Sequence, residues 1–120
     1  EAESKVEYAK MQGDYYRYMC EYTDAAQRAD AINSAAAFYQ TAFDVSMELS
    51  PGNATRLGLC LNFSVLYYEI MGKQEEAKKM AEDALRDSSR DTADENAESI
   101  ISLLEVRFNP TLLVFTLPAA

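Results

Sequence analysis

Four side chains able to carry charge or donate hydrogen bonds lie close together in the first predicted helix. At steps of four, three and one they form a single stripe: Lys10, Asp14, Arg17 and Tyr18. An arginine on such a stripe suits phosphate, because its planar guanidinium makes paired, charge-assisted hydrogen bonds. The ordinary alternative is that Arg17 pairs with Asp14, a surface contact worth about a few tenths of a kcal/mol. The residue types alone therefore favour the pairing of Arg17 with Asp14 on a helix surface over an anion-binding site.

A second set of candidate residues lies on the third predicted helix. Spacings of four, three and four bring these residues onto one face, which could line a groove: Gly58, Asn62, Val65 and Glu69. Asn62 is the most informative, because an amide on a largely apolar helix costs free energy if it faces nothing. Glu69 fits plain surface charge equally well, and Gly58, Leu61 and Val65 fit ordinary packing.

The groups that most enzymes use are largely absent from the sequence. The chain has no histidine, which removes the commonest general base, the usual zinc ligand and any Ser–His or Cys–His pair. It has no Gly-rich phosphate loop, and its acidic stretch at 91–95 lacks the spacing of a calcium loop. A carboxylate dyad stays open, since any of the 20 acidic residues could meet in space. We predict no enzymatic activity, no metal site and no cofactor.

The charge balance indicates the kind of partner. The chain of 120 residues carries 20 acidic and 11 basic residues, a net charge of −9, which repels nucleic acid and anionic lipid. It contains no apolar run of about 18 residues and no signal peptide. Cys20 and Cys60 lie far apart within apolar helical pattern, which predicts buried free thiols of a reducing compartment. We expect a cytoplasmic protein that binds neither nucleic acid nor membrane.

Hydrophobic spacing predicts an all-α domain of about five antiparallel helices, stacked as successive hairpins. The predicted helices cover approximately residues 4–22, 24–49, 54–71, 74–87 and a segment capped at 91–92 that ends before Pro110. Their predicted apolar faces are Tyr8, Met11, Tyr15, Cys20 and Tyr22 on the first helix, Ile32, Ala35, Ala36, Tyr39, Phe43 and Met47 on the second, and Leu59, Phe63, Leu66 and Ile70 on the third.

We expect residues 1–109 to form one helical domain and residues 110–120 to form an apolar tail. The apolar run from Leu112 to Leu117 is much shorter than a membrane span. Our hypothesis is that the tail packs back on the domain, over a groove or over an uncovered face. The alternative is a disordered terminus.

Long segments of the chain resemble the 14-3-3 family, in the order in which that family carries them. They are the phosphate-reading helix around KMQGDYYRY at 10–18, the sixth helix around AFYQTAFDVS at 37–46, and the seventh helix around RLGLCLNFSVLYYEI at 56–70. Ser50-Pro51 stands where the family has a loop proline, and the resemblance extends to about Leu104. It implies the C-terminal half of a 14-3-3-like helical array.

The resemblance also implies a function and residues for it. The family consists of adaptors that bind phosphoserine or phosphothreonine segments of client proteins in an amphipathic groove. By resemblance, Arg17 would fork onto the phosphate, Tyr18 would donate its hydroxyl to it, and Lys10 would add positive potential. Asn62 would hold the main chain of the client, with Glu69 close to the same line. The apolar wall would consist of Gly58, Leu61 and Val65.

The chain also departs from the family pattern. It begins at the family's fifth helix, so the dimer interface and two further basic residues of the pocket would lie outside it. One hydrogen bond to a charged group contributes about 1.5–3 kcal/mol, whereas micromolar affinity requires about 8 kcal/mol. Arg107 stands where the family has a clamping asparagine. We therefore expect weak or incomplete binding, and self-association or pairing with the missing N-terminal helices.

Two other functions remain open at this stage. Residues 66–77 resemble part of a tetratricopeptide repeat, and a scaffold of that type would bind unphosphorylated peptide. However, Ala42-Phe43 and Ala84-Leu85 recur 42 residues apart, against about 34 for that repeat. The second alternative is an obligate half that functions only with an N-terminal partner.

Overall fold

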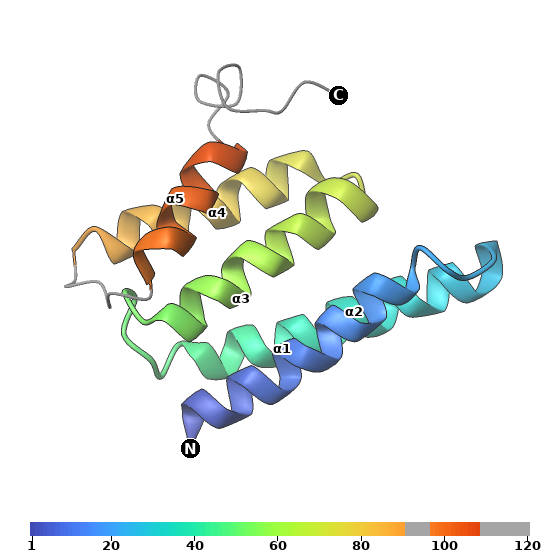
Figure 1. Ribbon diagram of the computed structural model, residues 1–120, viewed down its shortest axis with the longest axis horizontal. Coiled ribbons are helices and arrows are strands. Elements are labelled where there is room, and N and C mark those ends of the chain that lie inside the picture. Colours follow the sequence, from blue (N-terminus) through green and yellow to red (C-terminus); the bar gives the residue numbers. More distant parts are fainter. Residues whose placement is uncertain (91–96, 109–120) are drawn as a thin grey trace.

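The helices of the protein are arranged as a layered array in the computed structural model, which describes residues 1–90 and 97–108, with side chains to residue 105. The elements are α1 (Ala2–Met19), α2 (Ala25–Ser46), α3 (Ala54–Val65), the π-helical turn η1 (Leu66–Ile70), α4 (Gln74–Ser88) and α5 (Glu98–Phe108) (Figure 1). The all-α prediction is confirmed over these residues. The fifth helix is described to Phe108. Its expected end before Pro110, its expected cap at 91–92 and the tail at 110–120 lie outside the described residues.

Helix α3 occupies the centre of the array. The helices α1 and α2 pack together along their length, and α4 and α5 lie on the other side of α3 (Figure 1). Because α3 contacts α1, α2, α4 and α5, a side chain on its α1-facing side lies between two layers. This is the position from which Asn62 meets α1.

Local sequence explains where the helices start and stop. The carboxylate of Asp24 accepts a hydrogen bond from the Gln27 backbone N–H at 2.9 Å and so caps α2. The Asn53 side chain caps α3 in the same way through the Arg56 N–H at 3.0 Å. Gly72 has a φ of 69°, a left-handed backbone conformation that residues with a side chain rarely adopt. It therefore ends the helical run.

The third predicted helix is not α-helical throughout. After Val65 the chain forms the π-helical turn η1, and the Met71 N–H donates to the Leu66 carbonyl at 2.9 Å, five residues back. A π-helical turn holds more residues than an α-helical one. The regular spacing that was expected to carry one face from Gly58 to Glu69 therefore stops before Glu69.

The predicted apolar face of the first helix is wrong at four of its five residues. Tyr8, Met11, Tyr15 and Tyr22 are exposed, at 67%, 63%, 57% and 81%. The residues that α1 buries are small: Val6, Ala9 and Gly13. The facing surface of α2 is also built from small residues, with Ala31, Ala35 and Ala42 buried around Tyr39. Small residues on both helices permit close approach, whereas a stripe of tyrosines would hold them apart.

Two hydrophobic clusters lie on either side of α3. The first joins α1, α2 and α3 and includes Tyr39, Leu59 and Phe63, three buried residues that the spacing predicted correctly. The second joins α3, α4 and α5 around Leu57 and Leu104. The prediction for Met47 is wrong, because its side chain is 51% exposed at the end of α2. Cys20 and Cys60 are buried free thiols, as predicted.

Candidate functional site

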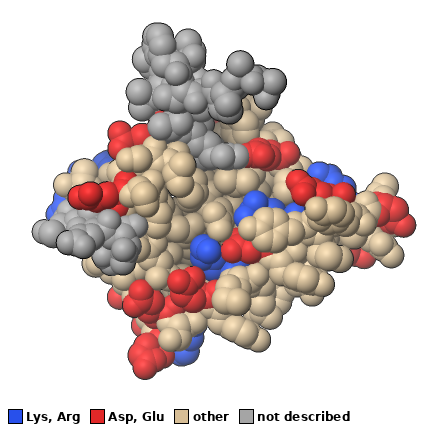
Figure 2. Space-filling view, in the orientation of Figure 1, with Lys and Arg blue, Asp and Glu red and all other residues tan. Residues whose placement is uncertain are grey.

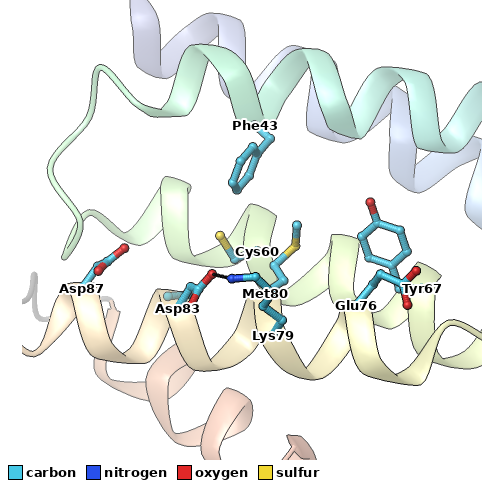
Figure 3. A pocket seen from close by; sticks show the side chains of 9 residues that line it. Phe43, Cys60, Tyr67, Glu76, Lys79, Met80, Asp83 and Asp87 are labelled. Atoms are coloured by element: carbon cyan, nitrogen blue, oxygen red, sulfur yellow. Dashed lines mark hydrogen bonds and ion pairs between the residues drawn. The ribbon is translucent and has the colours of Figure 1, made fainter.

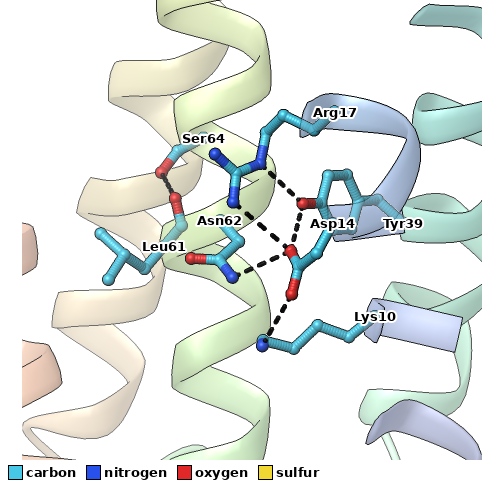
Figure 4. A network of polar contacts seen from close by, with 7 residues as sticks. All are labelled: Lys10, Asp14, Arg17, Tyr39, Leu61, Asn62 and Ser64. Carbon is cyan, nitrogen blue, oxygen red and sulfur yellow. Dashed lines mark hydrogen bonds and ion pairs between the residues drawn. The ribbon is translucent and has the colours of Figure 1, made fainter. Parts of the chain in front are cut away.

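The polar side chains of three helices meet at the carboxylate of Asp14 (Figure 4). Lys10 Nζ donates to Asp14 Oδ2 at 3.2 Å, and Asn62 Nδ2 donates to Asp14 Oδ1 at 3.0 Å. Arg17 Nη2 lies 3.6 Å from Asp14 Oδ1, and the Tyr39 hydroxyl from α2 donates to that same oxygen. We call these five residues the Asp14 cluster. It links three predicted site residues, Lys10, Arg17 and Asn62.

Arg17 is held on several sides. Its Nε donates to the Tyr39 hydroxyl oxygen at 2.9 Å, and its Cζ lies 4.7 Å from the centroid of the Tyr18 ring, a cation–π contact. Burial by itself lowers the pKa of Arg17, but the hydrogen bond to Tyr39 and the Asp14 carboxylate outweigh it, so the pKa is raised. The guanidinium is therefore a permanent cation with little freedom to rotate.

The hydroxyl of Tyr39 is fixed as a donor to Asp14 and an acceptor from Arg17. Burial, and then the hydrogen bond to the Asp14 carboxylate, raise the pKa of Tyr39 well above its ordinary value. The phenol thus keeps its proton at physiological pH. Asn62 is also oriented, because with its amide turned over its oxygen would face the Asp14 oxygen.

The other predicted site residues lie at different distances from the Asp14 cluster. Gly58 is close, since a Cβ added to it would come within 3.8 Å of Lys10 Cε and 3.7 Å of Ile100 Cδ1. Tyr18 is 56% exposed beside Arg17. Leu61 instead packs against the second hydrophobic cluster, with α4 and α5. Val65 is half-buried at the end of α3, and Glu69 is exposed on η1.

The Asp14 cluster sets basic groups within an acidic surface. Figure 2 shows Lys and Arg atoms in the middle of the face where α1 and α3 lie opposite each other, with acidic patches around them. The side chains of Lys10 and Arg17 are 19% and 15% exposed, so both cations are partly screened from water. Reduced contact with water strengthens their attraction for an anion.

Sequence reasoning missed one member of the Asp14 cluster, Tyr39, whereas the pairing of Arg17 with Asp14, given as the ordinary alternative, is present in the structure. Tyr39 was predicted as a core residue. Tyr39 is indeed fully buried, but its hydroxyl reaches α1. One sequence feature could have indicated this arrangement. Gly13 lies inside a helix, where glycine costs about 1 kcal/mol relative to alanine, so a close neighbour is the natural explanation.

A hollow lies away from the Asp14 cluster, between α2, α3, η1 and α4 (Figure 3). Its volume is about 220 Å³, and no predicted site residue lines it. The Cys60 thiol faces it, and burial raises the pKa of this thiol to about 11. Cys60 is therefore a protonated, weakly nucleophilic group at neutral pH.

The described residues contain neither a metal-binding cluster nor a membrane-spanning helix. Within residues 1–90 and 97–108, no group of three or more Cys, Asp or Glu side chains converges to hold a metal ion. None of the helices in those ranges combines the length and apolar character that crossing a membrane requires.

The fold and the Asp14 cluster define an all-α protein with a partly buried, hydrogen-bonded polar cluster between two helix layers. The sequence profile of the 14-3-3 protein family matches residues 1–107, and the chain belongs to the 14-3-3 family. It is 44% identical over 115 residues to the 14-3-3-like protein GF14-A of Oryza sativa subsp. japonica, covering 92% of this chain and 44% of that protein.

Relatives in other organisms match over a similar span. A 14-3-3 protein of Giardia intestinalis is 39% identical over 117 residues, which is 94% of this chain and 47% of the relative. The 14-3-3-like protein GF14-12 of Zea mays is 40% identical over 117 residues, 95% of this chain and 45% of the relative. The chain thus spans less than half the length of these curated relatives.

Proposed function

We propose that this chain provides a non-enzymatic, phosphoserine- or phosphothreonine-dependent surface for binding client proteins. The observation that carries the proposal is the meeting of Lys10, Arg17 and Asn62 at Asp14. Two cations around one carboxylate give this spot a net charge of +1 within a chain of net charge −9. A partly buried, oriented cation of this kind favours a compact dianion over an extended acidic surface.

Each proposed contact has a chemical reason. Arg17 forks onto the phosphate, Tyr18 donates its exposed hydroxyl, and Lys10 adds positive potential. The Asn62 Nδ2 is already bonded to Asp14, which leaves its carbonyl oxygen to accept a main-chain N–H of the client. The proposed wall and far end of the groove consist of Gly58, Leu61, Val65 and Glu69. Gly58 lies beside Lys10, whereas Leu61 packs toward α4 and α5.

Binding by this chain alone is weak. A single charged hydrogen bond contributes about 1.5–3 kcal/mol, and micromolar affinity needs about 8 kcal/mol. Tight binding therefore requires additional cations from outside these residues.

We further propose that the exposed stripe of α1 is covered by helices outside this chain or by a second copy. Tyr8, Met11 and Tyr15 line a shallow hollow of about 340 Å³ on this stripe together with Gln12 and Tyr16. Exposed aromatic side chains in a row are typical of an interface. Light scattering and a hydrophobic dye test this directly, since a monomer that binds no dye has no apolar face to cover.

A titration monitored by NMR tests the phosphate dependence, because NMR detects millimolar binding. A phosphoserine peptide should shift signals of Lys10, Arg17 and Asn62, while the unphosphorylated peptide should not. Arg17→Ala should abolish the difference, and Arg86→Ala, which removes a 54% exposed arginine of α4, should preserve it. If both peptides bind alike, the proposal fails and an unphosphorylated-peptide scaffold becomes the better description.

A further inference from the structure

Tyr39 connects the buried core to the Asp14 cluster. Its ring belongs to the first hydrophobic cluster and packs on Phe63 at a centroid distance of 5.3 Å. Its hydroxyl donates to Asp14 and accepts from Arg17 Nε. A residue rooted in the core thus determines where a guanidinium on the neighbouring helix lies.

We propose that Tyr39 is a positioning residue that selects the edge of the Arg17 guanidinium presented to a ligand, and that Gly13 is required for it to do so. This inference rests on the proposed function. A guanidinium has five N–H groups and can fork onto phosphate either through Nε and one Nη or through both Nη atoms. In this protein Nε is occupied by Tyr39, and Nη2 faces Asp14 as well. The terminal edge, formed by Nη1 and Nη2, remains for the phosphate.

Gly13 sets the distance between Tyr39 and α1. A Cβ added to Gly13 would lie 2.5 Å from Cδ1 and 2.6 Å from Cε1 of the Tyr39 ring, far inside van der Waals contact. The ring is fully buried and backed by Phe63, so it has no free space in which to retreat. Only a residue without a side chain lets the hydroxyl reach Asp14 and Arg17. Gly13 is therefore needed for Tyr39 to position Arg17.

The protonated phenol of Tyr39 keeps its two hydrogen bonds in one arrangement. Burial and the hydrogen bond to Asp14 raise the pKa of Tyr39, so the phenol donates to Asp14 throughout the physiological range. Because that donation leaves a lone pair of the oxygen for Arg17 Nε, the direction of each bond is fixed. The terminal edge of Arg17 is thus oriented before any ligand arrives, which reduces the entropy lost on binding.

The Arg17 Nε–H resonance gives a direct reading of the positioning, independent of any peptide. In the unmodified chain this proton should exchange slowly with water and show a distinct shift, because it is bonded to Tyr39. Tyr39→Phe keeps the ring and removes the hydroxyl, and should bring exchange to the rate of a free arginine. Tyr22→Phe, at an 81% exposed tyrosine, should leave the resonance unchanged. An Arg17 Nε–H that exchanges freely in the unmodified chain overturns the inference without any variant.

Binding adds a second reading. Tyr39→Phe should weaken phosphopeptide binding about threefold to tenfold, the effect of one hydrogen bond. In an Arg17→Lys background, which keeps a positive charge and measurable binding but has no guanidinium, the same change should have no effect, because the group it positions is gone. Equal losses in both backgrounds would mean that Tyr39 acts through general stability, and the inference would be wrong.

The two failures are distinguishable. If the unmodified chain binds phosphorylated and unphosphorylated peptide alike, the proposed function fails, while the Nε–H exchange rate still decides whether Tyr39 positions Arg17. Gly13→Ala provides an independent variant. It should release the Arg17 Nε–H while the chain retains its helical circular dichroism, and a protected Nε–H in this folded variant would contradict the role of Gly13.

Discussion

The amide of Asn62 donates to the carboxylate of Asp14 across 3.0 Å, although the two residues lie 48 positions apart in the chain. This bond joins α3 to α1 at the level where Lys10 and Arg17 also contact Asp14. A polar link between helix layers satisfies groups that would otherwise be half-buried and unpaired. It also orients cations toward one place, so the same bond serves stability and the proposed site.

Removing the Asp14 carboxylate should destabilise the protein. Asp14→Ala leaves Lys10, Arg17 and Asn62 without their shared acceptor, and a partly buried donor that loses its partner costs about 1–3 kcal/mol. Urea denaturation followed by circular dichroism measures the change. The matched control is Asp44→Ala, at an exposed carboxylate of α2 that accepts from Gln40. Equal stability losses for the two variants would contradict a central role for Asp14.

Burying the Phe63 ring should contribute far more to stability than any exposed apolar residue does. Phe63 is 1% exposed, and its ring stacks on Tyr67 at 4.7 Å and packs on Tyr39 at 5.3 Å. Phe63→Ala should cost about 3–5 kcal/mol, through lost transfer free energy and the cavity left behind. Leu103→Ala, at a 54% exposed side chain of α5, should change the free energy of unfolding by about 0.5 kcal/mol or less.

Sequence pattern predicted the elements better than it predicted their faces. Helix caps and stops depend on local chemistry, and Asp24, Asn53 and Gly72 lie at the bounds of the predicted ranges 24–49 and 54–71. The apolar face of α1 depends on what packs against it. Tyr8 and Tyr15 satisfy helical spacing as well as Val6 and Ala9 do, and only the close approach of α2 selects the smaller pair.

The candidate site was predictable only in part, because spacing within one helix is visible in the sequence and contacts between helices are not. Lys10 and Arg17 lie on one helix, so their common stripe follows from spacing alone. Asn62 needed a partner, and the partner is Asp14, which no local pattern could identify across 48 residues. The role of Tyr39 depends on a side chain from a third helix reaching into the stripe. Such convergence is a tertiary property.

Alkaline pH should lower the free energy of unfolding, because the buried Cys60 thiol resists ionisation in the folded state. Burial raises the pKa of this thiol from 9.0 to about 11, so the folded state holds its proton more tightly than the unfolded state does. The contribution to stability is complete below pH 9 and is lost as the pH rises toward 11. Cys60→Ser should flatten that part of the profile of unfolding free energy against pH. A decline of equal steepness in both proteins would mean that other groups cause it.

Adding a methyl group to two helical glycines should have opposite effects. At Gly58 an added Cβ finds ordinary contacts, the nearest at 3.7 Å, and alanine favours a helix over glycine by about 1 kcal/mol, so Gly58→Ala should stabilise the fold slightly. At Gly13 the same atom would lie 2.5 Å from the Tyr39 ring. The ring cannot move without disturbing Phe63, and overpacking of this kind costs about 1–3 kcal/mol, which exceeds the gain in helix propensity.

Thermal unfolding of both glycine variants beside the unmodified chain measures these signs. Gly58→Ala should raise the midpoint and Gly13→Ala should lower it. An effect on helix propensity alone would raise the midpoint in both variants. A Gly13→Ala protein as stable as Gly58→Ala would therefore show that the Tyr39 ring can move away from the added Cβ. The contact that fixes its hydroxyl on Arg17 would then be too soft to orient a guanidinium.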